Sequence, residues 1–272
     1  MIDDNSKEFI KRHIGPSEED QSKMLQYIGY KSLDDLMENT VPEKILLKDE
    51  LKIDHPMSEN DALKKLKSIS KKNKIFKNFI GMGYYNSITP NVILRNILEN
   101  PGWYTSYTPY QPEVAQGRLE MLLNFQQSII DLTGMDIANA SLLDEATATA
   151  EAVGLSQRLD KTNSKKIFIS SNCNPQTIDL IKTRTNPFGL ELIIGDEKKE
   201  LSKINEDIIC GVLSYPGTLG EINDPSESIS QIHKKNGKAI LVCDLLALAR
   251  LKTPAELGAD IAVGSAQRFG IP

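Results

Sequence analysis

Cysteine and histidine are scarce in this chain of 272 residues, which contains three of each. Cys173, Cys210 and Cys243 lie far apart and form no C-x-x-C pair, and no two histidines stand at the spacing of metal ligands. A sparse, odd cysteine count is typical of a reducing compartment and argues against a disulfide framework or a zinc site. We therefore expect a cytoplasmic protein that holds no metal.

Long apolar runs are also missing, since none approaches the roughly 18 residues that a bilayer-spanning helix needs. The first residues, M-I-D-D-N-S-K-E-F, have neither the pattern of a signal peptide nor that of a transit peptide. Positive charge is not in excess, because Lys and Arg number 32 against 37 Asp and Glu, a net charge of −5. This balance gives no general attraction to nucleic acid or anionic membranes, and we expect neither as a partner.

One local exception to the charge balance is a cluster of lysines between Lys64 and Lys77. Such a run is more typical of a solvated helix face than of a nucleic-acid site. A docking patch for an acidic protein is the other interpretation.

Residues 1–75 are predicted to form an N-terminal arm of short, charged helices. Ser17, followed by three acidic residues, indicates one helix start, and Ser32 and Ser58 indicate two more, each in an S-x-x-D pattern. His55-Pro56 marks a connection between them. Because the segment is too polar to make a deep core, we expect it to pack on something larger.

The motif G-M-G-Y-Y-N at residues 81–86 contains two glycines, which permit positive φ or close approach of the backbone. No third glycine follows, so the motif is not a dinucleotide fingerprint. Thr89-Pro90 then predicts a helix that has threonine as its N-cap and proline in its first turn. Pro101-Gly102 is predicted to end that helix.

Aromatic residues are few but concentrated. Four of them fall within eight positions: Trp103, Tyr104, Tyr107 and Tyr110. They belong to the stretch 103–117, in which Pro109 and Pro112 exclude continuous secondary structure. A stiff loop with projecting hydroxyl groups is predicted. Its rings either fill the top of a core or line a binding site.

Two helices are predicted to follow this loop. From Glu113 the apolar residues recur at helical spacing, and Thr133-Gly134 closes the first helix. Ser141 and Asp144 fit a capping pattern for a second helix of small residues, A-T-A-T-A-E-A. Its free amide groups suit an anion or phosphate, although Asp144 and Glu145 already place negative charge there.

Strands alternate with helices in the rest of the chain. The strand candidates are 166–170, 190–194, 208–215, 239–243 and 260–263, and helices are predicted between most of them, at 176–183 and 226–235 for example. This alternation predicts an α/β fold with a mainly parallel sheet flanked by helices. Ligands of such sheets bind beyond the carboxyl ends of the strands.

Two candidate site features follow strands at that edge. Asp244 comes directly after the apolar run 239–243, and the polar loop 264–269, G-S-A-Q-R-F, follows the last strand candidate. In pyridoxal-phosphate enzymes an aspartate pairs with the pyridine nitrogen and a lysine forms the Schiff base. The loop contains no lysine, and Lys252, the only lysine between the two features, lies in a predicted turn. This part of the chain is therefore expected to hold no cofactor of its own.

Several motifs closely resemble the N-terminal part of the P-protein family, the decarboxylating glycine dehydrogenase of the glycine cleavage system. They are R-H-I-G-P at 12–16, G-M-G-Y-Y-N at 81–86, Y-T-P-Y-Q-P-E-V at 107–114, A-N-A-S-L-L-D-E at 138–145, D-L-L-A-L at 244–248 and G-A-D-I-A-V-G-S-A-Q-R-F-G at 258–270. One departure is Ala146, which stands where many members of the family have glycine.

The resemblance implies an aspartate-aminotransferase-like PLP-transferase large domain over residues 76–272, incomplete at its C-terminal end, behind the 1–75 arm. It implies two homologous halves, of which the C-terminal one carries the Schiff-base lysine and pyridoxal 5'-phosphate. Gln267 falls at the lysine position, so no catalytic residue is expected in this half. The family reaction takes glycine and the oxidised lipoyl group of the H-protein, releases carbon dioxide and transfers the aminomethyl group.

The resemblance also suggests site residues for the shared interface. Tyr84, Tyr107, Thr108, Tyr110 and Ser141 are expected to line the active site, with Ser141 at a helix start. The implied partners are the PLP-binding half, the lipoylated H-protein and glycine.

Asp244 matches the pyridine-binding position but is expected to be vestigial and structural. The alternatives to an enzyme part are a non-catalytic pairing subunit or a fragment that is inactive alone.

Overall fold

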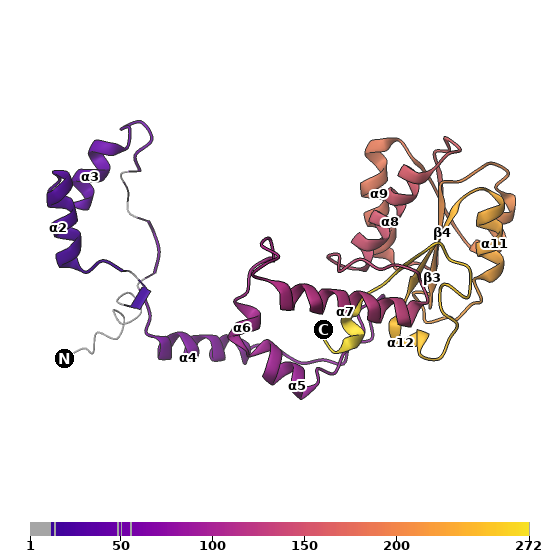
Figure 1. Cartoon of the computed structure of the whole chain (residues 1–272), viewed down its shortest axis with the longest axis horizontal. Helices are drawn as coiled ribbons and strands as arrows, with labels where there is room; N and C mark the ends of the chain where they lie inside the picture. The colour runs from indigo at the N-terminus through magenta and orange to yellow at the C-terminus, as the bar shows by residue number, and fades with distance from the viewer. Residues whose placement is uncertain (1–11, 14, 48, 50, 55, 272) are drawn as a thin grey trace. The chain divides into compact units, whose positions relative to one another are not determined.

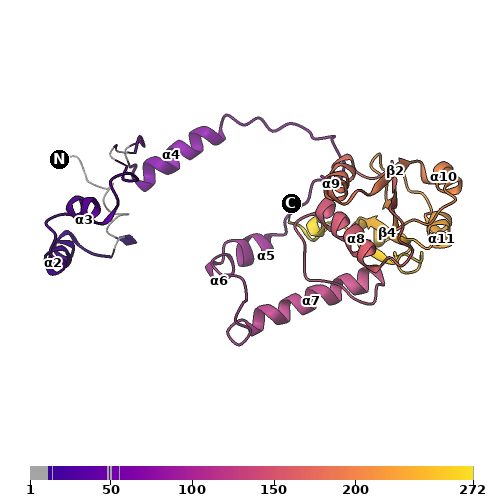
Figure 2. The ribbon, with the colours of Figure 1, turned by 90° about the horizontal axis from the view of Figure 1, so that it is seen from above.

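The computed structural model describes residues 12, 13, 15–47, 49, 51–54 and 56–271. The chain forms two compact units, Met1–Lys77 and Asn78–Pro272. Figures 1 and 2 show the ribbon in two views. Two residues of the sequence motifs, Ile14 in R-H-I-G-P and His55 before Pro56, lie outside the described residues.

Met1–Lys77 contains the helices α2 (Glu18–Ile28), α3 (Leu33–Thr40) and α4 (Glu59–Ser70). The three predicted helix starts are confirmed. Ser17 forms a full capping box with Asp20, and the Ser32 and Ser58 side chains accept hydrogen bonds from the amides three residues later. These caps satisfy amide groups that would otherwise lack partners at each helix start.

Asn78–Pro272 is built on a five-stranded parallel sheet in the order β2-β1-β3-β4-β5. The strands are β1 (Lys166–Ser170), β2 (Glu191–Gly195), β3 (Cys210–Tyr215), β4 (Lys238–Cys243) and β5 (Ile261–Val263). All five strand candidates are thus confirmed, with shifts of one or two residues at some ends. The α/β fold with a parallel sheet is the one that the alternating pattern predicted.

Helices cover both faces of the sheet and enclose two hydrophobic cores. The helices α8 (Glu145–Leu159) and α9 (Pro175–Thr185) lie on one face, and α11 (Ser226–Lys234) lies on the other, as Figures 1 and 2 show. Neighbouring residues of β1 point to opposite faces: Ile167 and Ile169 join the α8–α9 core, while Phe168 packs in the core under α11. This alternation is why the apolar runs of the sequence are continuous, since both faces are buried.

The residues before the sheet form a string of helices. The predicted helix that reaches Leu98 is present, but its N-cap and the role of Pro101 differ from the prediction. The helix predicted from Thr89 begins at Asn91, and consists of α5 (Asn91–Ile93) followed by the π-helix η1 (Leu94–Leu98). Pro90 is at the N-cap position, and no side chain makes a capping hydrogen bond there. Pro101 does not end that helix but opens a new one, α6 (Pro101–Tyr104), because the Asn100 side chain accepts a hydrogen bond from the Gly102 amide at 2.9 Å.

The long helix α7 (Gln116–Thr133) starts three residues after Glu113, where helical spacing was first expected, because residues 112–114 form a turn. It ends at Thr133 as predicted, and Gly134 is its C-cap with a φ of 71°. The Ala255 amide donates to the Thr133 carbonyl oxygen, so this end of α7 is tied to the sheet region. No helix in the described ranges combines the length and apolar character that crossing a bilayer demands.

Candidate functional site

The features predicted after two strands do meet at the carboxyl edge of the sheet. Asp244 follows β4 and caps the short helix α12 (Leu245–Leu248), where its Oδ1 accepts from the Leu246 amide at 2.9 Å. Arg268 lies after β5 in the 3-10 helix η4 (Ala266–Phe269). Parallel strands end at the same edge, which brings these two residues together across 24 positions of sequence.

Arg268 donates hydrogen bonds to both carboxylate oxygens of Asp244. Its Nε lies 3.0 Å from Oδ1 and its Nη2 lies 2.7 Å from Oδ2, the two-pronged geometry that a guanidinium offers to a carboxylate. The pair is mostly buried, since the side chains of Arg268 and Asp244 are 17% and 20% exposed. The hydrogen bond to Asp244 raises the pKa of Arg268 above its usual value, so this charge is fixed.

The guanidinium of Arg268 also lies over the ring of Tyr85, 4.7 Å from its centroid. This is a cation–π contact, in which the cation faces the negative side of the ring. Tyr85 belongs to the G-M-G-Y-Y segment, called the 81–85 loop below. The aspartate, arginine and tyrosine therefore form a continuous chain of contacts from β4 to this loop.

The side chain of Gln267 binds the backbone of the same loop. Its Nε2 donates to the Gly83 carbonyl oxygen at 2.6 Å, and its own carbonyl accepts from Ser87 Oγ at 3.0 Å. Gln176, at the start of α9, donates to the Met82 carbonyl oxygen. Asp244, Gln267, Arg268, Gly83 and Tyr85 are called the carboxyl-edge cluster below.

Glycine is required at position 83 for two reasons. Its φ is +85°, and a Cβ there would lie 2.9 Å from Asn174 Nδ2. That amide in turn donates to Glu145 Oε1 at 2.9 Å. Burial raises the pKa of Glu145 despite this hydrogen bond, and the negative charges of Asp244 and Asp144 add to the rise.

The start of α8 differs from the prediction made for Ser141. The helix begins at Glu145, and Asp144 is its N-cap, accepting from the Thr147 amide at 2.7 Å. Ser141 is exposed and stands three residues before the cap, so it is not at the helix start. Two capping patterns overlap here, the expected S-x-x-D from Ser141 and a D-x-x-T from Asp144. Because the helix starts at Glu145, Asp144 is the residue in the N-cap position.

The cluster does not fit pyridoxal phosphate. That cofactor needs a lysine amine and a carboxylate free to pair with the pyridine nitrogen. Gln267 offers an amide, which cannot form a Schiff base and already donates to Gly83. Both oxygens of Asp244 are taken by Arg268.

The remaining predicted site residues fall in two places. Tyr84, 63% exposed, projects from the 81–85 loop at the carboxyl edge. Tyr107, Thr108 and Tyr110 lie together in the connection between α6 and α7, with the rings of Tyr107 and Tyr110 5.9 Å apart. Figures 1 and 2 show this connection at the end of α7 remote from the sheet.

Residues 107–110, called the tyrosine tip below, are ordered by local contacts. The Tyr110 amide donates to the Thr108 carbonyl oxygen at 2.8 Å, and Arg118 of α7 donates to the Tyr107 carbonyl oxygen. The rings are nevertheless bare, since Tyr107 is 79% and Tyr110 76% exposed. The core-filling interpretation of this stretch is therefore wrong for these two rings.

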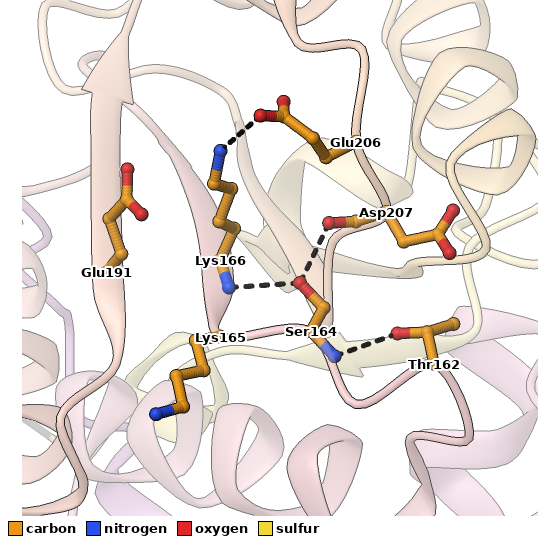
Figure 3. Close-up of a pocket in the computed structure, with 7 residues that line it drawn as sticks. All are labelled: Thr162, Ser164, Lys165, Lys166, Glu191, Glu206 and Asp207. Atoms are coloured by element: carbon orange, nitrogen blue, oxygen red, sulfur yellow. Dashed lines mark hydrogen bonds and ion pairs between the residues drawn. The ribbon is translucent and has the colours of Figure 1, made fainter.

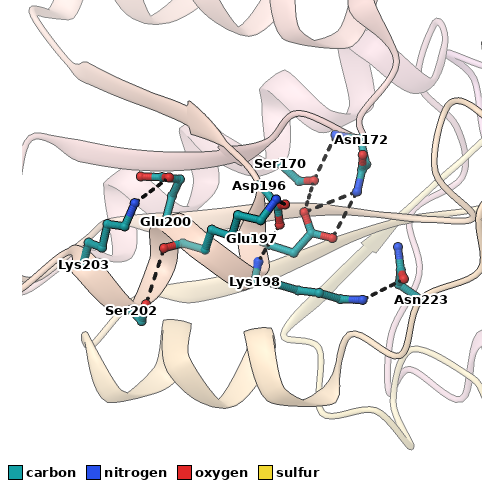
Figure 4. A network of polar contacts seen from close by, with 10 residues as sticks. Ser170, Asn172, Asp196, Glu197, Lys198, Glu200, Ser202, Lys203 and Asn223 are labelled. Atoms are coloured by element: carbon teal, nitrogen blue, oxygen red, sulfur yellow. Dashed lines mark hydrogen bonds and ion pairs between the residues drawn. The ribbon is translucent and has the colours of Figure 1, made fainter.

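The sequence did not reveal the roles of four groups at the carboxyl edge. Arg268 belongs to the motif at 258–270, and an arginine beside Gln267 is a sequence signal that could have matched it to Asp244. The others belong to a polar network at the ends of β1 and β2, where Glu197 accepts from Ser170 Oγ at 2.5 Å and from Asn172 Nδ2 at 3.3 Å (Figure 4). Nothing in the residue spacing marks this network.

A depression in the surface lies at the opposite, amino edge of the sheet. Its volume is about 310 Å³. Lys166 and Glu191, the first residues of β1 and β2, line it together with Glu206 from the loop before β3 (Figure 3). Lys166 Nζ lies 2.7 Å from Glu206 Oε1, so the central charges neutralise one another. It is remote from the carboxyl edge at which ligands of parallel sheets bind. Among the described residues no group of His, Cys, Asp and Glu could hold a metal ion.

A model of the family described as glycine cleavage system P-protein matches residues 11–272. The chain belongs to this family. Similar members are the proteins named glycine dehydrogenase (decarboxylating) from Pelagibacter ubique (strain HTCC1062), 73% identical over the whole chain, and from Nostoc sp. (strain PCC 7120 / SAG 25.82 / UTEX 2576), 54% identical over 97% of it. The chain spans only 28% and 27% of the lengths of these relatives.

Solved structures agree with this membership. A structure described as glycine decarboxylase (P-protein) of the glycine cleavage system, in inhibitor-bound form, is 31% identical with a TM-score of 0.84. The match covers 96% of this chain and 59% of that one. The cystine C-S lyase C-DES, at 14% identity and a TM-score of 0.52 over 70% of this chain and 53% of that one, shows the shared PLP-transferase fold alone.

Proposed function

We propose that this chain is the portion of a glycine-decarboxylating P-protein that carries no Schiff-base lysine. The assembled enzyme takes glycine and the oxidised lipoyl group of the H-protein. It releases the glycine carboxylate as carbon dioxide and leaves the aminomethyl group on one lipoyl sulfur and a proton on the other. Pyridoxal phosphate, bound by the other half, supplies the electron sink for the carbanion that decarboxylation leaves.

One contrast carries the proposal. The positions that would hold a cofactor in this fold are occupied by the chain's own contacts, Asp244 with Arg268 and Gln267 with Gly83. Tyrosine rings that a self-sufficient domain would bury are instead exposed at the tyrosine tip. A member of this family with a closed edge and an exposed aromatic surface is suited to completing a site whose cofactor belongs elsewhere.

We assign the roles of this portion to binding and orientation. Tyr107 and Tyr110 offer hydroxyl groups that donate or accept hydrogen bonds, on a backbone held by Pro109 and by Arg118. Thr108 adds a third hydroxyl, and Tyr84 adds a fourth from the 81–85 loop. Ser141, although not at a helix start, stays a candidate lining residue.

Removal of single hydroxyl groups in the assembled enzyme tests this function. Tyr107→Phe and Tyr110→Phe keep the ring and lose the hydrogen bond, and we expect kcat/KM for glycine to fall about tenfold or more in at least one of them. Tyr27→Phe is the matched control, because Tyr27 is an exposed tyrosine on α2. Full activity of both tip variants and of Tyr84→Phe would contradict the proposal.

A second candidate is a pairing module that takes no part in the chemistry. Its support is the apolar surface of unit Asn78–Pro272, where large side chains are exposed, namely Val114, Leu123, Ile137 and Leu143. Under this alternative, Val114→Asp and Leu123→Asp would weaken assembly with the other half, while Tyr107→Phe would leave turnover unchanged. Sedimentation of the mixed halves and turnover assays separate the two candidates.

A further inference from the structure

The two residues at the cofactor positions of this fold have a shared task in this chain, because both hold the 81–85 loop. Gln267, at the lysine position, donates to the Gly83 carbonyl oxygen at 2.6 Å. Asp244, at the pyridine position, fixes Arg268, whose guanidinium lies over Tyr85. A loop thus lies where the residues of a cofactor site would otherwise face a ligand.

The loop needs such contacts to keep one conformation. Gly81, Met82 and Gly83 all have positive φ, at 64°, 57° and 85°. A segment with two glycines has a large conformational freedom to lose on folding, and methionine is disfavoured in this region of φ. Within the loop, the Tyr84 amide donates to the Gly81 carbonyl oxygen at 3.0 Å, which closes a turn just before Tyr84.

Tyr84 is the member of the loop that points outward, and it directly precedes the ring that Arg268 contacts. Tyr85 is 37% exposed, against 63% for Tyr84. A change in the position of Tyr85 therefore moves its neighbour as well, since the two share a peptide bond. One cation–π contact and one peptide bond connect the charge pair at the edge of the sheet to the exposed tyrosine.

We propose that Asp244 and Arg268 are positioning residues that, through Tyr85, hold Tyr84 in the orientation in which it meets the substrate. The inference rests on the proposed function for the part that concerns substrate. Arginine is needed rather than lysine, because only a planar guanidinium can hold both carboxylate oxygens and stack on a ring at the same time.

Hydrogen exchange in the assembled enzyme tests the structural part. In Arg268→Gln and Asp244→Asn, we expect the amide of Tyr84 and its neighbours in peptide 81–86 to exchange about tenfold faster, because the loop opens more often. Arg268→Lys should give an intermediate rate. Arg184→Gln is the matched control, since Arg184 pairs with Glu151 on the α8–α9 surface and not at the loop.

Steady-state kinetics test the connection to substrate. Loss of a merely structural contact lowers the fraction of active enzyme, which reduces kcat and leaves KM for glycine unchanged. A misplaced Tyr84 weakens substrate binding, so we expect KM to rise about tenfold in Arg268→Gln and also in Tyr84→Phe. Tyr85→Leu, which removes the ring that Arg268 contacts, should behave as Arg268→Gln.

Each outcome decides. Faster loop exchange together with a higher KM supports the inference. Unchanged exchange in Arg268→Gln overturns it, whatever the kinetics show. Faster exchange with an unchanged KM overturns the assignment to substrate positioning. The tip variants Tyr107→Phe and Tyr110→Phe then decide separately whether the proposed function itself stands.

Discussion

The carboxyl-edge cluster and the tyrosine tip carry polar and aromatic groups of similar kind, but they use them in opposite ways. At the edge these polar groups have partners within the chain: Asp244 has Arg268, Gln267 has Gly83, and Glu145 has Asn174. At the tip the backbone is held while the rings stay exposed. Within the described chain, the edge therefore satisfies these polar groups internally, whereas the tip leaves its aromatic rings exposed to solvent.

The largest expected difference between the two regions concerns pyridoxal phosphate itself. Addition of the cofactor to the 272-residue chain should give no visible absorbance band of a lysine Schiff base, because position 267 holds an amide. Gln267→Lys alone should not create the band, because Arg268 still holds Asp244. Gln267→Lys combined with Arg268→Ala frees both positions. A band from the unsubstituted chain would contradict the assignment of Gln267.

The next contrast compares two glycines with the same backbone geometry. Gly83 has φ +85° at the cluster and Gly220 has φ +86° in open space. Gly220→Ala should cost about 1 kcal/mol of unfolding free energy from backbone strain, and Gly83→Ala about 1 kcal/mol more, because it also displaces Asn174 from Glu145. Urea denaturation measures both. Equal costs would show that the close approach at Gly83 is not maintained.

Glu145 makes the stability of the carboxyl edge depend on pH. Because burial raises its pKa when the chain folds, the folded state holds this proton more tightly than the unfolded state. Stability is therefore lost as the pH rises above the ordinary carboxyl value of 4.5 and through the higher pKa of the folded state. Glu145→Gln removes the loss and keeps an acceptor for Asn174.

Thermal melting checks this expectation. The Glu145→Gln chain should melt at a higher temperature than the unsubstituted chain at pH 8, and the difference should shrink as the pH approaches 4.5. Glu113→Gln, on the turn before α7, is the control at the open end. A difference that is the same at every pH would contradict the raised pKa.

The smallest expected effect on stability is in the first turn of α7, next to the tyrosine tip. Gly117 is in the first turn of α7, and a Cβ there meets nothing within 4 Å. Gly117→Ala should therefore raise the unfolding free energy by about 0.5–1 kcal/mol, because alanine loses less backbone freedom in a helix. A loss of stability in calorimetry would show that this turn is more crowded than the structure has it.

The sequence predicted best what depends on neighbouring residues. The strands were found because apolar runs buried on both faces are continuous, and the caps at Ser17, Ser32 and Ser58 follow from bonds that span three positions. Helix starts with two competing signals were misjudged. Pro101 suits either the end of one helix or the first turn of the next, and Asn100 decides for the second.

The cluster at the carboxyl edge could be predicted only in part. Asp244 and the loop without a lysine could be found in the sequence, because each directly follows a predicted strand. The pairing of Asp244 with Arg268, and of Gln267 with Gly83 across 184 positions, depends on which strands are neighbours. Spacing along the chain does not contain that information. The exposure of the tip likewise depends on where α7 points.

The helix α7 also sets a rotational phase. Its 18 residues span about 27 Å at a rise of 1.5 Å per residue, from the tip to the end that Ala255 holds. Each added residue would turn the tip by about 100° around the helix axis and advance it by about 1.5 Å. An insertion of about seven residues, close to two full turns, would restore the direction of the rings while lengthening α7. A change in the length of α7 by one residue therefore alters the direction of the tyrosine rings far more than it alters their distance from the sheet.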